Sequence, residues 1–214
     1  RPLRVQRQPR NGYLQFRISP RVVPVSAVRP VRLIVGITGA TGVIYGIRTL
    51  QVLRELSVES HLVITDMGKT TISMETDYAI GDVEKLATRV YPVRDLAARI
   101  STGSSPVDGM IVAPCSVRTL SAVANCANDN LLTRAADVTL KERRRLVLMF
   151  REAPLHAGHC ELMLDASRIG AILMPPVPVF YTRPQTIAEL VDQTVGRVLD
   201  LWGLEMPGLN RWGV

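Results

Sequence analysis

Short apolar runs alternate with longer amphipathic segments along the chain from Val31 onward. Apolar runs of this length suit strands that are buried on both faces, and amphipathic segments suit the helices that cover them. The alternation therefore predicts βαβ units in one α/β domain, a doubly wound parallel sheet over residues 31–205, with residues 206–214 as a C-terminal tail. Ligands of such a sheet bind outside the carboxyl ends of its strands.

The pattern predicts five strands and seven helices. The strands are expected at Arg32–Thr38, Ser60–Thr65, Gly109–Ala113, Leu146–Phe150 and Ala171–Met174. The helices are expected at Val43–Leu56, Thr70–Tyr78, Val83–Arg89, Thr119–Ala127, Leu131–Glu142, His156–Ser167 and Thr186–Trp202.

Composition excludes several classes of protein. Of the 214 residues, 47% are hydrophobic and 21% are charged, which is too apolar for a disordered chain. No apolar run approaches the roughly 18 residues of a membrane-spanning helix, so we expect no membrane partner. The three cysteines, Cys115, Cys126 and Cys160, are odd in number and not clustered, which favours a reducing compartment over a disulfide framework. We therefore expect a cytoplasmic protein.

The net charge of +7 belongs to the first thirty residues, which hold seven arginines, five prolines and no acidic residue. The rest of the chain has 19 basic and 19 acidic residues, so the folded part offers no overall field for a nucleic acid. Residues 1–30 are expected to form a disordered basic leader. A leader rich in arginine and free of acid also resembles an organellar transit peptide, which would give a mitochondrial location.

A glycine-rich turn, Gly36–Gly42, joins the first expected strand to the first expected helix. Glycines allow close approach to a phosphate, and the helix N-terminus offers it unpaired N–H groups, so a nucleotide site is expected there. The spacing G-x-x-G-x-x-G also suits a purely structural turn. Asp66 follows the second strand, the position at which a nicotinamide enzyme binds ribose, so a short-chain dehydrogenase is an alternative. That class has a catalytic tyrosine followed four residues later by a lysine, and no tyrosine of this chain has a lysine at that spacing. A short-chain dehydrogenase would therefore lack its base.

Four further groups of residues have a chemical interpretation, and some of them also have a structural one. Ser116 and Thr119 open a helix and could cap it or donate to a phosphate or a flavin edge. Cys115 is expected to be a buried structural thiol, because no spacing supplies a base. His156 and His159 lack the second ligand pair of a closed zinc site, so no metal is expected. Arg151 and Glu152, at the end of a buried strand, could grip an oxyanion and give it a proton.

Seven ordered blocks carry a resemblance to a known family. They are RLIVGITGATG (Arg32–Gly42), METD (Met74–Asp77), PCSVRTLSAV (Pro114–Val123), LLTRAADVTLKERR (Leu131–Arg144), REAPLHAGH (Arg151–His159), MPPVPVFYTRPQT (Met174–Thr186) and VGRVLDLWGLE (Val195–Glu205). From Arg32 to Trp212 the chain resembles the UbiX-type flavin prenyltransferases. The resemblance implies a Rossmann-like (flavodoxin-like) fold.

The resemblance also implies an activity. Such enzymes join a dimethylallyl group from dimethylallyl monophosphate to N5 and C6 of reduced FMN, without a metal. The product, prenylated FMN, serves UbiD-type decarboxylases, including the one of ubiquinone biosynthesis. The family assembles as a homododecamer in which neighbouring subunits complete each active site.

The family pattern assigns roles to residues of this chain. FMN would be held by Gly39, Ala40, Thr41, Thr65, Ser116, Val117, Arg118, Thr119 and Arg151. The substrate phosphate would be held by Lys141, Arg151, Tyr181 and Arg197. The catalytic residues would be Glu152, Glu75 and Lys141. The chemistry agrees, because a departing phosphate needs cations and an acid, and bonding at C6 needs a base for the ring proton.

Two departures and two alternatives remain open. Thr41 and Thr65 stand where many members have serine, and Asp66 replaces a common lysine.

An FMN-dependent cysteine decarboxylase would share the fold, but the first helix lacks its catalytic histidine, with Tyr45 as the nearest polar group there. A non-catalytic FMN-binding protein would not need Glu152 and the phosphate-binding residues.

Overall fold

The computed structural model describes residues 29–211 and 213, so the expected leader lies outside these residues except for Arg29 and Pro30. Arg29 is tied to the body of the protein. Its guanidinium donates to both carboxylate oxygens of Asp108, at 2.6 and 3.0 Å, and to the carbonyl of Pro106 at 3.1 Å.

Six parallel strands form one sheet in the order β3-β2-β1-β4-β5-β6. The strands are β1 (Arg32–Ile37), β2 (Glu59–Ile64), β3 (Arg89–Tyr91), β4 (Gly109–Cys115), β5 (Arg145–Phe150) and β6 (Ile172–Leu173). Successive strands step outward from β1 in one direction and from β4 in the other. The expectation of a doubly wound parallel sheet is confirmed, and the order reverses between β1 and β4.

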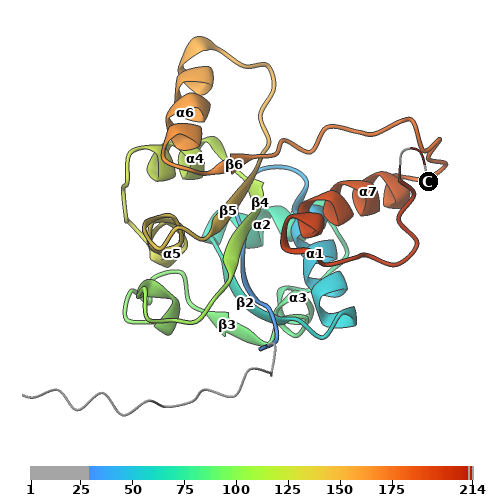
Figure 1. The fold of residues 1–214 in the computed structure, drawn as a ribbon. Coiled ribbons are helices and arrows are strands. Elements are labelled where there is room, and N and C mark those ends of the chain that lie inside the picture. The colour runs from blue at the N-terminus through green and yellow to red at the C-terminus, as the bar shows by residue number, and fades with distance from the viewer. Residues whose placement is uncertain (1–28, 212, 214) are drawn as a thin grey trace, which may run out of the picture.

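Helices cover both faces of the sheet (Figure 1). They are α1 (Val43–Glu55), α2 (Asp66–Glu75), α3 (Ile80–Glu84), α4 (Val117–Ala124), α5 (Leu131–Lys141), α6 (Ala157–Arg168) and α7 (Ile187–Leu199), with short 3₁₀ turns η1 (Arg99–Ser101) and η2 (Asp200–Trp202). One apolar cluster joins the sheet to α1, α2, α3 and α7, and another joins it to α4, α5 and α6.

Alternate residues of the central strands feed these two clusters. Leu33, Val35 and Ile37 of β1 belong to the first, whereas Ile34 belongs to the second. All seven residues of β4 are buried. Because both faces are covered, these strands read in the sequence as continuous apolar runs.

The structure changes the type of one expected element, at the edge of the sheet. A helix was expected over Val83–Arg89, but α3 ends at Glu84 and Arg89 begins the edge strand β3. That strand has only three residues, and Val90 at its centre is 41% exposed. An exposed edge strand this short has no apolar run, so the pattern that revealed the other strands is absent from it.

Candidate flavin site

A cleft of about 390 Å³ opens at the carboxyl ends of the strands, where the strand order reverses. Among the expected FMN-binding residues, five line it: Gly39, Thr65, Ser116, Arg118 and Thr119. They come from the segments that directly follow β1, β2 and β4, with Arg118 and Thr119 in the first turn of α4. The cleft therefore brings together motifs that are far apart in the sequence.

The glycine turn is bound closely to its neighbours. A Cβ atom at Gly39 would lie 2.4 Å from the Cβ of Met67, so a side chain at this position would displace the start of α2. Gly42, the N-cap of α1, has a φ of 93°, which favours glycine. The turn thus keeps its backbone at the cleft, while Ala40 and Thr41 continue along the same loop.

Thr38 joins the loop after β1 to the loop after β4. Its buried hydroxyl donates to the Pro114 carbonyl at 2.7 Å and accepts from the Ser116 amide at 2.9 Å. One side chain therefore fixes the spacing of two cleft walls. No sequence pattern predicts this role, because Thr38 and Pro114 are 76 residues apart along the chain.

Two helices point capped N-termini toward the cleft. The Thr65 hydroxyl accepts from the Gly68 amide at 3.0 Å, and the Ser116 hydroxyl accepts from the Thr119 amide at 3.3 Å. Both helices therefore start earlier than expected, directly after the capping residue. The capping interpretation of Ser116 is confirmed, and the helix ends also supply the N–H donors and positive dipole that suit a phosphate.

Residues that sequence reasoning did not select also line the cleft. Asn130 caps α5 and forms a capping box with Thr133, a signal that the spacing of these two residues carries. Asp66 lies at the cleft with its carboxylate 3.6 Å from the guanidinium of Arg94, which also lines it. The negative charge that replaces the common lysine is therefore accompanied by a positive one.

Glu75 caps a helix that has no capping side chain of its own. Its carboxylate accepts from the amides of Gly42 and Val43, at 2.8 and 3.3 Å, at the start of α1. The contact places the Glu75 carboxylate beside the glycine turn. It also places that carboxylate at the N-terminus of α1, the positive end of the helix dipole.

Arg151 and Glu152 follow β5 directly and are both exposed. The Arg151 amide donates to the Cys115 carbonyl at 3.1 Å, which ties the pair to the end of β4. Burial raises the pKa of the Tyr45 hydroxyl on α1, while a hydrogen bond with Thr194 and the charge of Arg151 lower it.

The remaining expected phosphate ligands lie elsewhere in the chain. Lys141 ends α5 before β5 begins, and its ammonium is 2.5 Å from the Glu142 carboxylate. Arg151 follows the other end of β5, so a six-residue strand, roughly 20 Å at about 3.3 Å per residue, separates the two positions. One copy of the chain therefore does not bring Lys141 to Arg151.

Tyr181 and Arg197 lie near the C-terminal tail. Arg197 is paired with Asp200, whose carboxylate also accepts from Arg211 of the tail at 2.7 and 2.8 Å. These hydrogen bonds, that from Arg211 first, lower the pKa of Asp200. Tyr181 is 45% exposed, and it adds slightly to the rise in the pKa of Arg211 that Asp200 mainly causes. The structure thus brings Tyr181 and Arg197 to one region, but neither residue lines the cleft.

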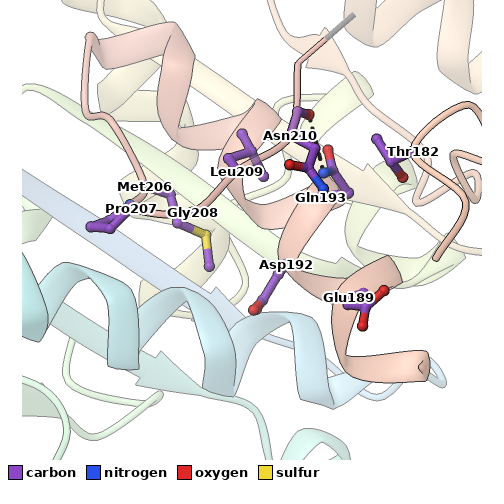
Figure 2. Close-up of a pocket in the computed structure, with 9 residues that line it drawn as sticks. All are labelled: Thr182, Glu189, Asp192, Gln193, Met206, Pro207, Gly208, Leu209 and Asn210. Atoms are coloured by element: carbon purple, nitrogen blue, oxygen red, sulfur yellow. Dashed lines mark hydrogen bonds between the residues drawn. The ribbon is translucent and has the colours of Figure 1, made fainter. Parts of the chain in front are cut away.

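A small second cavity, of about 90 Å³, lies between α7 and the tail (Figure 2). Glu189 and Asp192 line it, and both already accept hydrogen bonds, from the Gln185 amide and the Arg48 guanidinium. Gln193 donates to the Asn210 carbonyl at 3.1 Å and so holds the tail. Because its described lining holds two carboxylates and no lysine or arginine, this cavity does not suit a phosphate.

The thiol and metal expectations concern Cys115 and the histidines of α6. Burial raises the pKa of the Cys115 thiol far above its usual range, which confirms a structural thiol. His156 and His159 stack on each other, with ring centroids 3.7 Å apart. In residues 29–211 and 213, no three His, Cys, Asp or Glu side chains gather as a metal site.

No helix in residues 29–211 is long and apolar enough to cross a membrane.

The fold and the cleft define a nucleotide-binding α/β protein whose site suits a flavin phosphate. The Flavoprotein family model matches residues 25–199. The flavin prenyltransferase UbiX of Thauera aromatica is 54% identical over 181 residues, which cover 85% of this chain and 93% of that protein. The mitochondrial flavin prenyltransferase of Saccharomyces cerevisiae is 50% identical over 203 residues, 94% of this chain and 84% of that one.

Solved structures agree with these relatives. AnUbiX in complex with FMN and dimethylallyl pyrophosphate has a TM-score of 0.86 at 48% identity, over 87% of this chain and 99% of that one. A dodecameric FMN-dependent UbiX-like decarboxylase from Escherichia coli O157:H7 has a TM-score of 0.84 at 50% identity, over 86% of this chain and 100% of that one. An FMN-dependent cysteine decarboxylase, 15% identical with a TM-score of 0.56, shares the fold alone. The chain belongs to the Flavoprotein family, and within it to the UbiX-type flavin prenyltransferases.

Proposed function

We propose that this chain transfers a dimethylallyl group from dimethylallyl monophosphate to N5 and C6 of reduced FMN, without a metal, and releases phosphate and prenylated FMN. The observation that carries the proposal is the cleft itself, which is lined by a glycine turn and two capped helix N-termini. The Arg151 amide is bonded to Cys115, the residue before Ser116. The AnUbiX relative, solved with FMN and dimethylallyl pyrophosphate, supports it. A diphosphate donor is the alternative that this relative suggests.

The donors at the cleft fit a phosphate-bearing flavin. Hydroxyls of Thr65 and Ser116 and the N-termini of α2 and α4 can hold a phosphate and polar ring edges, and Arg118 adds a charge. Reduced FMN, when bound, supplies the two positions to which the dimethylallyl group is joined. These residues therefore bind and orient, and they exchange no proton.

Arg151 and Glu152 have the chemistry for the departing phosphate. A guanidinium offers paired N–H donors that match phosphate oxygens, so Arg151 would stabilise the charge that develops as the carbon–oxygen bond breaks. Glu152 would hold the proton that the phosphate takes as it leaves. Glu75, beside the glycine turn, would accept the ring proton lost from C6.

The phosphate site would be completed by other copies of the chain. Lys141 is separated from Arg151 by the length of β5, and the E. coli O157:H7 relative is dodecameric. We therefore propose a homododecamer in which neighbouring copies bring Lys141, and Tyr181 with Arg197, to the Arg151–Glu152 pair. A monomer that has full activity at micromolar concentration, by sedimentation and turnover, would contradict this.

Prenylated FMN would be consumed by a UbiD-type decarboxylase, in ubiquinone biosynthesis or aromatic acid decarboxylation. The proposed location is the cytoplasm, or the mitochondrion if residues 1–30 act as a transit peptide. A relative whose printed name is mitochondrial makes the second location worth testing. Fusing residues 1–30 to a fluorescent protein and following its import into isolated mitochondria distinguishes the two.

The activity is tested by anaerobic incubation with reduced FMN and dimethylallyl monophosphate, followed by mass spectrometry of the flavin. The expected product is heavier than FMN by one dimethylallyl group with two new bonds, at N5 and C6. Arg151→Ala should lower both FMN affinity and rate, because Arg151 is assigned to both ligands. Recovery of unmodified FMN from flavin-saturated wild-type protein, with either the monophosphate or the diphosphate donor, would refute the proposal.

A further inference from the structure

A cavity of about 140 Å³ lies at the amino ends of the strands, opposite the flavin cleft. Arg32, Glu59 and Arg89 begin the adjacent strands β1, β2 and β3, and they line it. Arg99, at the start of η1, and Ser105, in the loop before β4, line it as well. The proposed prenyl transfer uses none of these residues.

The lining of this cavity carries an excess of positive charge. Three arginines face one carboxylate, Glu59, which is 2.7 Å from the Arg32 guanidinium and 3.8 Å from that of Arg89. Within the described part of the chain, Arg99 has no acidic side chain within ion-pair distance. Two positive charges are therefore left without a carboxylate of their own.

Two buried polar atoms at this cavity lack a hydrogen-bond partner in the described part of the chain. They are Nε2 of His61, a side chain 3% exposed, and Oγ of Ser105, a residue 2% exposed. The Nε2 atom is 3.2 Å from a Glu59 oxygen but outside hydrogen-bond geometry. Buried polar groups are almost always paired, so two orphaned atoms in one cavity indicate a missing ligand.

In one of its two tautomers, His61 has Nε2 as a donor. Its Nδ1 atom is 2.9 Å from the Tyr91 hydroxyl, and the two rings stack at 5.8 Å. When that hydroxyl donates to Nδ1, the ring proton lies on Nε2. Burial lowers the pKa of His61, with the charges of Arg89 and Arg99 acting in the same direction and Glu59 in the opposite one. In this tautomer the imidazole turns its N–H group toward the cavity, with a Glu59 oxygen 3.2 Å from Nε2.

We propose that this cavity is a second anion site, which binds a tetrahedral oxyanion such as inorganic phosphate. The Arg89 and Arg99 guanidinium groups supply charge and paired donors, and the Ser105 hydroxyl and the His61 Nε2–H group each supply one more. One Glu59 oxygen is paired with Arg32, and the other lies 3.2 Å from His61 and 3.8 Å from Arg89, so the anion binds against one negative charge with three arginines around it. A volume less than half that of the flavin cleft admits an oxyanion but not a nucleotide.

The test is binding of labelled inorganic phosphate to the FMN-saturated protein by equilibrium dialysis. Saturation with FMN occupies the flavin cleft, and any phosphate bound by the transferase site is common to all variants. Arg99→Gln should raise the dissociation constant of the second class of sites roughly ten- to a hundredfold, since it removes a charged hydrogen-bond donor. Ser105→Ala should raise it roughly two- to tenfold.

The matched control is Arg168→Gln, which removes an exposed arginine of α6 that does not line the cavity. It should leave the number and affinity of phosphate sites unchanged, and prenyl transfer should persist in all three variants. If sulfate competes with the labelled phosphate and glycerol 3-phosphate does not, the site binds free oxyanions. If glycerol 3-phosphate also competes, the site accepts phosphate monoesters. Equal phosphate stoichiometry and affinity in the wild type, Arg99→Gln and Ser105→Ala would overturn the proposal.

Discussion

Replacing Thr38 by valine removes the hydroxyl that joins two walls of the flavin cleft. Valine keeps the shape of threonine but leaves the Pro114 carbonyl and the Ser116 amide without the bonds of 2.7 and 2.9 Å that they now make. An unsatisfied buried backbone group costs about 1–3 kcal/mol, so Thr38→Val should destabilise the protein by about 2–6 kcal/mol. Thr38→Ser should be milder, because it keeps the hydroxyl and loses only a methyl group.

Thr139→Val is the matched control, with the same change at an equally buried position. The Thr139 hydroxyl donates only to the Ala135 carbonyl of its own helix, at 2.7 Å. That carbonyl is also positioned to accept the ordinary helical bond, so the control should cost only about 0.5–1.5 kcal/mol. Because Thr139 does not line the cleft, the control should also leave the cleft walls as they are.

The measurements are the urea midpoint by circular dichroism, at one protein concentration for all variants, and FMN affinity by fluorescence quenching. Thr38→Val should unfold at clearly lower urea than Thr139→Val and bind FMN more weakly, since Ser116 and Gly39 are then less well fixed. Equal midpoints and equal FMN affinities for the two valine variants would refute the reasoning.

Three further predictions concern the proton donor, the thiols and the N-terminus. Glu152→Gln should keep FMN binding and slow formation of the bond to N5 by roughly 10²–10⁴-fold in anaerobic single-turnover assays, the usual contribution of general acid catalysis. If the variant loses FMN but reacts at the normal rate in its flavin-saturated fraction, Glu152 is a structural partner of Arg151 instead. A thiol reagent should modify the exposed Cys126 and Cys160 in the native protein but not Cys115, because burial shields that thiol and raises its pKa. Fast labelling of three thiols per chain, measured by mass spectrometry, would contradict this. Deleting residues 1–28 should leave flavin binding and turnover unchanged, and loss of the soluble oligomer in sedimentation would argue otherwise.

The central sheet could be predicted from the sequence because burial on both faces leaves a long apolar run. All seven residues of β4 are buried, and its apolar run is visible in the sequence. The edge strand β3 could not be predicted, since its central residue is exposed and its pairing with β2 is its main constraint. Helix starts were misplaced where a hydroxyl caps the helix, because a threonine or serine before a helix is also common in loops.

The cleft-lining residues were predictable because they follow strands, and parallel strands end at one edge. The contact of Glu75 with the start of α1 joins residues 33 apart and depends on how α2 packs, which spacing does not reveal. The amino-end cavity was missed for a similar reason. His61 and Ser105 look like ordinary strand and loop residues, and only the packed structure shows that their polar atoms lack partners.

The length of β5 between Lys141 and Arg151 has a genetic consequence. If each catalytic centre takes these residues from different copies, two chains that are each inactive can rescue one another. Co-assembly of a Lys141→Ala chain with a Glu152→Gln chain would then produce some centres with both native side chains, whereas mixing either chain with itself would not. Two loss-of-function alleles of this gene could therefore complement each other in a cell, as alleles of a protein whose sites lie within one subunit could not.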